Sequence, residues 1–268
     1  MTKGKAIFTC ILSATIFVYA ANDAQHAKVS KRQVSTTVST NQSPLLADTH
    51  KSGVKEKMLK REGYTVSYNS DTRQPNYVAW ELTAKKLEGK NKRKGSFFED
   101  PELYDNEKAR LKDYYNSGYD RGHICPAADN KWSKIAMIES FYLSNICPQT
   151  HTLNAGDWLT LEEKCRKWAK KEALHIISGP IFRNQKRTKL KKRVDIPTHF
   201  FKAIVTLEKG KEKGIAFIYS NDQGHHPIDY YVCSIDDVEA ITKFDLFSSL
   251  PTKLQTKIEA QKNLKNWK

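Results

Sequence analysis

The stretch Asp120-Arg121-Gly122-His123 begins a segment that combines an imidazole, a cation and several oxygen donors. The further donors in this segment are Asn145, Asn154 and Glu162. An imidazole can take a proton from water, a guanidinium can bind phosphate, and amide or carboxylate oxygens can bind a hard metal ion. Phosphodiester hydrolysis requires these three abilities at one place, so the segment predicts a site of that kind.

Each of these residues, taken singly, also fits a structural role. Asn154 and Asp157 are residue types that cap helix N-termini, and Glu162 could be a solvated helix residue. Arg121 could simply pair with Asp120. The spacing of the whole set, rather than any one member, favours a functional site.

The set lies within a longer pattern that resembles the DNA/RNA non-specific endonucleases. This is the ββα-metal-finger group that includes Serratia-type nucleases and endonuclease G. The resemblance extends from Tyr64 to about Thr242. Its closest segments are residues 120–129, 140–145, 148–149, 153–154 and 158–162. Outer segments are residues 76–80, Arg93 with Phe97, 100–101, 178–181 and 196–202.

The resemblance implies a catalytic mechanism. His123 matches the general base that activates water, and a neutral imidazole is suited to that task. Asn154 matches the single direct protein ligand to Mg²⁺, with Mn²⁺ as a substitute. Glu162 matches the acid that reaches the ion through water, because on a continuous helix it lies too far from Asn154 for both to bind directly.

The resemblance also implies how the substrate is held. Arg121 and Arg93 match two cations beside the scissile phosphate, and Asn145 matches a polar residue that supports the site and contacts substrate. The expected reaction is metal-dependent hydrolysis of DNA and/or RNA without sequence preference, with 5′-phosphate products. Phosphate contacts carry no base information, which gives the lack of sequence preference a physical basis.

The residue patterns predict an α+β fold with a largely antiparallel central sheet and flanking helices, because strands dominate without regular β-α alternation. The resemblance makes this the ββα-metal (His-Me finger) nuclease fold. Predicted strands are 64–68, 77–82, 174–177, 200–207, 214–219 and 230–234. Predicted helices are 133–141, about 154–171, 236–242 and 252–261, the first with an apolar stripe at Ile135, Ile138 and Phe141.

Composition and charge indicate the kind of partner. The chain has 268 residues, with 45 Lys and Arg against 30 Asp and Glu, a formal charge of +15. Its length suffices for a large folded core. A positive excess of this size favours a polyanion such as nucleic acid, an anionic membrane surface or an acidic polysaccharide. The alternative is an ordinary basic protein whose lysines keep it soluble.

The N-terminal sequence predicts export. Lys3 and Lys5 precede an apolar run that ends in small residues at 20–21, a pattern typical of a secretory signal peptide over residues 1–21. A retained N-terminal membrane anchor is the alternative. Polar residues 22–60 predict a flexible leader, and residues 61–268 a single endonuclease domain. The expected location is periplasmic or secreted.

Four cysteines follow the predicted signal peptide, and in an oxidising compartment they allow three pairings. They are Cys125, Cys147, Cys165 and Cys233. A bridge between Cys125 and Cys147 is one hypothesis, because both lie beside the candidate site. A basic run at 186–193 could extend a nucleic-acid groove or be a solvated loop.

Two other classes of function stay open from the sequence. One is an exported nucleic-acid-binding or uptake protein that has lost catalysis. The other is a phosphodiesterase or phosphatase that acts on small nucleotides. The joint presence of His123, Asn154 and Glu162 favours the endonuclease over both.

Overall fold

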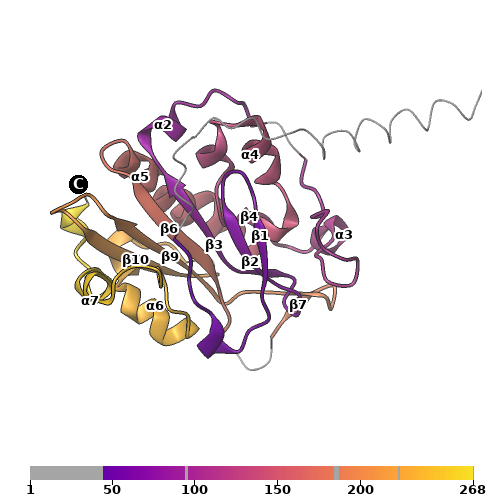
Figure 1. Cartoon of the computed structure of the whole chain (residues 1–268). Helices are drawn as coiled ribbons and strands as arrows, with labels where there is room; N and C mark the ends of the chain where they lie inside the picture. Colours follow the sequence, from indigo (N-terminus) through magenta and orange to yellow (C-terminus); the bar gives the residue numbers. More distant parts are fainter. Residues whose placement is uncertain (1–44, 94–95, 184–186, 223, 268) are drawn as a thin grey trace, which may run out of the picture. The chain divides into compact units, whose positions relative to one another are not determined.

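The computed structural model describes residues 45–267 except 94–95, 184–186 and 223, and these residues form one compact unit. A sheet of seven strands runs through this unit in the order β1-β2-β3-β6-β9-β10-β11 (Figure 1). Every neighbouring pair in it is antiparallel. The predicted α+β class with a largely antiparallel sheet is therefore confirmed.

The strands of this sheet have the following bounds: β1 Lys57–Lys60, β2 Thr65–Asn69, β3 Gln74–Leu82, β6 Leu174–Ile181, β9 His199–Thr206, β10 Lys213–Ser220 and β11 Val232–Cys233. The central strands are rich in β-branched and aromatic residues, which favour pleated backbone. The residues of β3 and β6 are buried almost without interruption. A strand buried along its whole length must be covered on both faces.

Two separate clusters of apolar side chains cover the two faces. Along β3, Val78 and Trp80 belong to one cluster, whereas the alternating neighbours Tyr77 and Ala79 belong to the other. This alternation is the two-residue period of a strand. Helix α5 (Trp158–Ala169) packs on the first face. Helices α6 (Ile235–Thr242) and α7 (Thr252–Glu259) pack on the second.

The predicted site residues from Arg121 to Glu162 lie in a smaller unit that ends in α5. Strand β4 (Asp120–His123) pairs antiparallel with β5 (Ile146–Gln149), so that His123 lies opposite Ile146. The chain then enters α5 through a π-helical turn, η5 (Leu153–Asp157). Two antiparallel strands followed by a helix form the ββα unit that the resemblance implies.

Short elements complete the described chain. A second small ribbon pairs β7 (Lys189–Leu190) with β8 (Val194–Asp195). The short helices are α2 Ala84–Leu87, α3 Leu111–Tyr114 and α4 Lys134–Glu139. The 3₁₀ turns are η2 His50–Ser52, η3 Ala127–Asn130, η4 Leu143–Asn145, η6 Ile228–Tyr231 and η7 Leu264–Asn266.

Two local predictions, one of a strand and one of a buried helix face, differ from the structure. The predicted strand 230–234 shrinks to β11, because Tyr230 and Tyr231 lie in the 3₁₀ turn η6. The predicted helix over 133–141 exists as α4, but Ile135 and Ile138 are 56% and 39% exposed. Its buried residues are Ala136 and Met137, so the helix packs with a different face from the predicted stripe.

The helix predicted from about 154 is not continuous. Gly156 has φ −110° and ψ −105°, which are not helical values, within the π-helical turn that precedes α5. Asn154 and Asp157 do not serve as side-chain caps of α5. Asp157 instead accepts a hydrogen bond from the Tyr231 hydroxyl at 2.5 Å. The break separates the backbone of Asn154 from the regular helix that carries Glu162.

The leader predicted to reach residue 60 ends earlier. Strand β1 pairs with β2 along its whole length, and the backbone of Asp48 bridges Asp245. Residues 45–60 therefore belong to the folded unit. The predicted signal peptide and the rest of the leader lie outside the described residues. Within the described ranges, the helices are all too short or too polar to cross a bilayer.

Gly122 allows a close approach inside the ββα unit. A Cβ atom at this position would lie 1.9 Å from Oε1 and 2.6 Å from Cγ of Gln149, whose side chain is fully buried. Gly122→Ala is therefore expected to lower the free energy of unfolding by about 1–3 kcal/mol, the usual effect of overpacking. Urea denaturation measures the change.

The variant Gly122→Ala/Gln149→Ala serves as the control for this clash, because it removes all three of the closest Gln149 atoms. The second substitution should recover part of the stability lost by the first, giving a clear coupling energy. Simple additivity of the two losses would show that contact with Gln149 is not the reason for glycine here.

Candidate active site

His123 ends β4 and lies in a group of aromatic rings. Its ring centroid is 5.3 Å from that of Phe97 and 5.1 Å from that of Phe141, and these two phenylalanines contact each other. The backbone carbonyl of His123 accepts a hydrogen bond from the indole of Trp158 on α5. The imidazole is thus held by packing, and its backbone is tied to the helix.

The surroundings of His123 keep its ring uncharged. Burial, with a smaller contribution from the positive charge of Arg93, lowers the pKa of His123 to about 3. The imidazole is therefore neutral throughout the neutral and mildly acidic range. Its Nε2 atom is buried and has no hydrogen-bond partner in the described part of the chain. An unsatisfied buried nitrogen costs about 1–3 kcal/mol, which points to a partner supplied by water or substrate.

Asn154 is oriented by a carboxylate from the neighbouring strand. Its Nδ2 donates to Oδ2 of Asp120 at 2.9 Å, and the same oxygen lies 2.9 Å from Nδ1 of His151. Because the nitrogen end of the Asn154 amide is held, its oxygen end is left available as a ligand. His151 is a peripheral member of this group, since its side chain is 80% exposed.

Glu162 belongs to a buried charge network on α5. Its side chain is only 11% exposed, and Oε2 lies 3.8 Å from Nη1 of Arg166 one turn later. Arg166 also pairs with Asp129 at 3.2 Å. Burial raises the pKa of Glu162 to about 7, with Asp129 raising it further and Arg166 opposing the rise. Glu162 therefore changes its charge near neutral pH.

A buried lysine lies behind this network. The ammonium of Lys202 on β9 lies 5.0 Å from the ring centre of Trp80 and 4.4 Å from that of Trp158. Lys202 is almost fully buried, and its charge lowers the pKa values of Asp129 and Glu162 against the effect of burial. A desolvated cation–π contact can contribute about 2 kcal/mol, which helps offset the cost of burying the charge.

Two arginines lie over the aromatic rings around His123. The guanidinium carbon of Arg121 lies 4.6 Å from the ring centre of Phe97, and that of Arg93 lies 5.4 Å from that of Phe141. Both side chains are exposed. The rings restrict where the two cations can be, while the charges stay accessible to an anion.

These residues meet at one pocket of about 410 Å³. Five of the six predicted site residues line it: Arg93, Arg121, His123, Asn154 and Glu162. Its remaining lining includes two more cations, Lys131 and Arg166. The pocket therefore combines a neutral base, an oriented amide and a carboxylate with several positive charges, which is an arrangement able to bind and hydrolyse a phosphodiester.

Residues 41–253 match the family described as DNA/RNA non-specific endonuclease. The match covers well over half of the chain and includes every residue that lines this pocket. The chain belongs to this family.

Individual relatives agree with this assignment. The chain is 34% identical over 218 residues to the mitochondrial nuclease of Saccharomyces cerevisiae, covering 72% of this chain and 66% of that protein. It is 32% identical to nuclease C1 of Cunninghamella echinulata, covering 74% of this chain and 85% of the relative. The match to the Xenopus laevis mitochondrial nuclease EXOG covers 70% of this chain but only 57% of that protein.

A solved structure has the same fold. It is entitled "Crystal structure of the EndoG/EndoGI complex: Mechanism of EndoG inhibition" and superposes with a TM-score of 0.71 at 26% identity. The superposition covers 78% of this chain and 92% of the other. This agreement confirms the predicted ββα-metal fold.

Asn145 is the one predicted site residue that does not line the pocket. Its side chain is fully buried and makes three hydrogen bonds of 2.9 Å to backbone atoms. The Oδ1 atom accepts from the N–H of Cys125, and Nδ2 donates to the carbonyls of Cys125 and Ser140. Asn145 therefore holds the loop after His123 from inside.

Three of the six cations in the basic run at 186–193 form ion pairs with buried carboxylates. Arg187 and Lys189 lie 2.9 and 2.7 Å from the buried carboxylate of Asp195, and Arg193 lies 3.1 Å from Asp113. These contacts hold the β7–β8 ribbon, so these three cations are not a free groove. Lys186 lies outside the described residues.

The described cysteines are all free thiols, so the predicted bridge between Cys125 and Cys147 is wrong. Both of these thiols are fully buried, and burial raises their pKa values well above the ordinary range. Cys125 accepts a weak hydrogen bond from Nδ2 of Asn130 at 3.4 Å. The two residues serve as small apolar groups beside the site.

Several residues of the site escaped the sequence-based prediction. Arg166 carried a usable signal, because it lies four positions after Glu162 on the same helix. Asp129 and Lys202 end two segments of the resemblance, residues 120–129 and 196–202, but no local pattern marks them as buried charges. Their contribution appears only when β9 and α5 are packed together.

The free thiols make a direct prediction. Alkylation of the native protein without reductant should leave Cys125 and Cys147 unmodified, because both are buried and protonated. Alkylation after denaturation, still without reductant, should modify both. Peptide mass spectrometry measures the labelling. Recovery of a Cys125–Cys147 cross-linked peptide would contradict the arrangement described here.

Proposed function

We propose that this protein is a Mg²⁺-dependent, sequence-non-specific endonuclease that hydrolyses phosphodiester bonds of DNA and/or RNA and leaves 5′-phosphate ends. The observation that carries the proposal is the pairing, in one pocket, of the neutral His123 with the oriented amide of Asn154. Family membership supports the same activity.

His123 acts as the general base. Its buried Nε2 has no partner among the described residues, and its lowered pKa leaves the ring unprotonated, so a nitrogen lone pair is available for a proton from an attacking water. A positioned base typically contributes about 10²–10⁴ to the rate. A ring held between Phe97 and Phe141 loses little freedom when the substrate binds.

Arg121 and Arg93 hold the scissile phosphate and counter its charge. They lie on the aromatic rings that surround His123, so an anion bound between them is close to the base. Charge that develops on phosphate oxygens during attack is stabilised by cations placed in advance. Phosphate-directed contacts also explain the proposed lack of base preference.

The residues of the pocket fit a bound Mg²⁺, or Mn²⁺ in its place. Asn154 supplies an amide oxygen because Asp120 holds its nitrogen end, and Glu162 supplies a nearby negative charge. A hard cation of this kind prefers oxygen ligands and keeps several waters, so few protein ligands suffice. When bound, the ion supplies charge stabilisation for the transition state and the leaving oxygen.

We further propose export, with a periplasmic or secreted location. The apolar stretch at residues 6–21 after two lysines carries this proposal. The relatives from S. cerevisiae and X. laevis are mitochondrial by name, so the mitochondrion is the competing destination. N-terminal sequencing of mature protein recovered from fractionated source cells distinguishes the two.

His123→Ala is expected to reduce cleavage of plasmid DNA in Mg²⁺ by about 10²–10⁴-fold while leaving the fold intact. Asn154→Ala should lose the response to Mg²⁺. His151→Ala is the matched control, since His151 is an exposed histidine of the same neighbourhood, and its effect should be small. Long DNA, long RNA and a small chromogenic diester are assayed in parallel. Near-wild-type cleavage by His123→Ala would contradict the proposed mechanism.

The requirement for Mg²⁺ should depend on pH through Glu162. Because the pKa of Glu162 is raised to about 7, a fall in pH below 7 protonates it and removes a negative charge from the pocket. The Mg²⁺ concentration for half-maximal cleavage should then rise by up to about tenfold for each pH unit. His123 stays neutral over this range because its pKa is about 3.

The variant Glu162→Gln shows whether the pH dependence comes from Glu162 or from another group. This variant should need more Mg²⁺ at pH 8 than the wild type, and its requirement should change little between pH 6 and 8. An unchanged pH dependence in Glu162→Gln would assign the titration to another group.

A further inference from the structure

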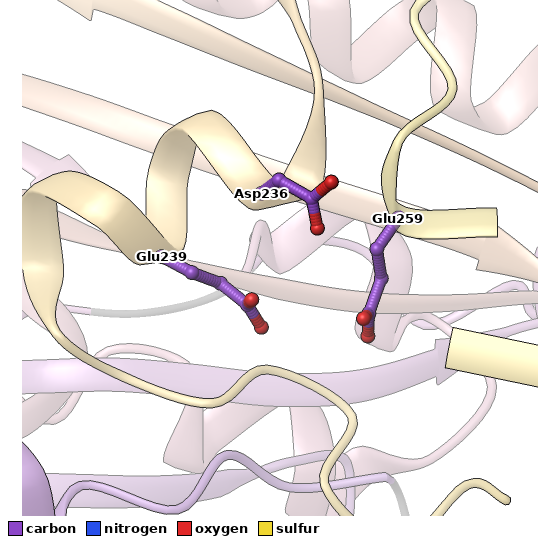
Figure 2. A group of neighbouring side chains, drawn as sticks. All are labelled: Asp236, Glu239 and Glu259. Carbon is purple, nitrogen blue, oxygen red and sulfur yellow. The ribbon is translucent and has the colours of Figure 1, made fainter. Parts of the chain in front are cut away.

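Three carboxylates gather between α6 and α7, on the sheet face opposite α5. Asp236 and Glu239 lie one turn apart on α6, and Glu259 is the last residue of α7. One oxygen from each of the three lies within 4.8 Å of the others. Figure 2 shows the three side chains directed toward a common space between the two helices.

Glu259 is the unusual member of this acidic cluster. Its side chain belongs to a residue that is only 6% exposed, and its Oε1 has no hydrogen-bond partner within the described ranges. An ionised carboxylate in such a position costs several kcal/mol unless a cation or donor compensates it. The ion pairs of the described residues include none that involves Asp236, Glu239 or Glu259.

The acids also disturb one another. Burial, followed by repulsion from Glu239, Asp236 and Asp245, raises the pKa of Glu259 to about 8. Burial also raises the pKa of Glu239 to about 7, although its hydrogen bond from the Leu246 N–H opposes the rise. A cation among the three would remove this repulsion.

We propose that Asp236, Glu239 and Glu259 form a binding site for a divalent cation, with Ca²⁺ the best match, separate from the pocket of His123. Ca²⁺ binds oxygens at about 2.3–2.6 Å, so two of its ligands can lie up to about 4.6–5.2 Å apart. The spacing of the cluster meets that limit. Ca²⁺ also tolerates irregular geometry, whereas Mg²⁺ requires near-octahedral coordination at about 2.0–2.1 Å.

The remaining ligands of the ion are waters. Asp236 is exposed, so the cluster is open to solvent on its side, and Ca²⁺ accepts a mixed shell of carboxylates and waters. The ion joins α6 to the last residue of α7 and so holds the two helices together. Asp236 and Glu239 lie within residues 41–253 and Glu259 lies beyond them, so the site extends past the part of the chain that matches the family.

The test is thermal unfolding of the full chain carrying Asn154→Ala, which removes the proposed ligand of the active-site ion. At pH 8, addition of about 10 mM Ca²⁺ to metal-free protein should raise Tm by about 3–10 °C, for a dissociation constant of about 0.1–1 mM. Adding Glu259→Gln should abolish this shift. The same substitution should raise the Tm of the metal-free protein at pH 8, because it removes a desolvated negative charge.

Glu208→Gln is the matched control, because Glu208 is an exposed acid of the β9–β10 turn that pairs with Lys211 and lies outside the cluster. It should keep the full Ca²⁺ shift. Glu239→Gln should lose the shift and provides the test if Glu259→Gln does not fold. Calorimetric titration with Ca²⁺ should detect binding by the Asn154→Ala parent and none after Glu259→Gln. An equal Tm shift with and without Glu259, or no shift in the parent, overturns the proposal.

Discussion

The position of His123 depends on the buried amide of Asn145. That side chain is hydrogen-bonded to both backbone polar groups of Cys125 and to the carbonyl of Ser140. The backbone carbonyl of Asn145 accepts a further hydrogen bond from the N–H of Ile124. The chain just after His123 is thereby joined to the end of α4 and the start of β5. Each net hydrogen bond contributes about 1 kcal/mol, but an unpaired buried amide costs more. Few other conformations of this loop would satisfy the Asn145 amide, so the loop is rigid and holds His123 in one position.

The second constraint is the burial of opposite charges beneath the pocket. Lys202 and Arg166 face Asp129 and Glu162 in a region that water scarcely reaches. Because desolvation penalises every charge there, Glu162 titrates near pH 7, whereas the same burial keeps His123 neutral. Burial thus lowers the pKa of His123 and raises that of Glu162 in the same pocket. The exposed arginines at its edge then supply the attraction for an anion.

Local patterns predicted much of the fold because strand alternation is a local property. The alternating apolar residues of β3 and the aromatic run of β9 could be recognised directly. The apolar stripe of Ile135 and Ile138 gave a wrong prediction of the buried face of α4. Burial on a short helix depends on its neighbours, and α4 packs through Ala136 and Met137. The early strand β1 was missed because it has only four residues, with a lysine at each end, and nothing local distinguishes it from a polar leader.

For the site, the sequence by itself determined the chemical inventory: the imidazole of His123, the amide of Asn154, the carboxylate of Glu162 and the arginines at 93 and 121. Spacing and residue type suffice for this, since the groups lie mostly on one segment. Only the tertiary structure decided that Asn145 is buried, that Cys125 and Cys147 are unbridged, and that Asp120 orients Asn154. Those outcomes depend on burial, and burial is set by the packing of elements that lie far apart in the chain. The same holds for the carboxylates at 236, 239 and 259, which α6 and α7 bring together only by packing on one sheet.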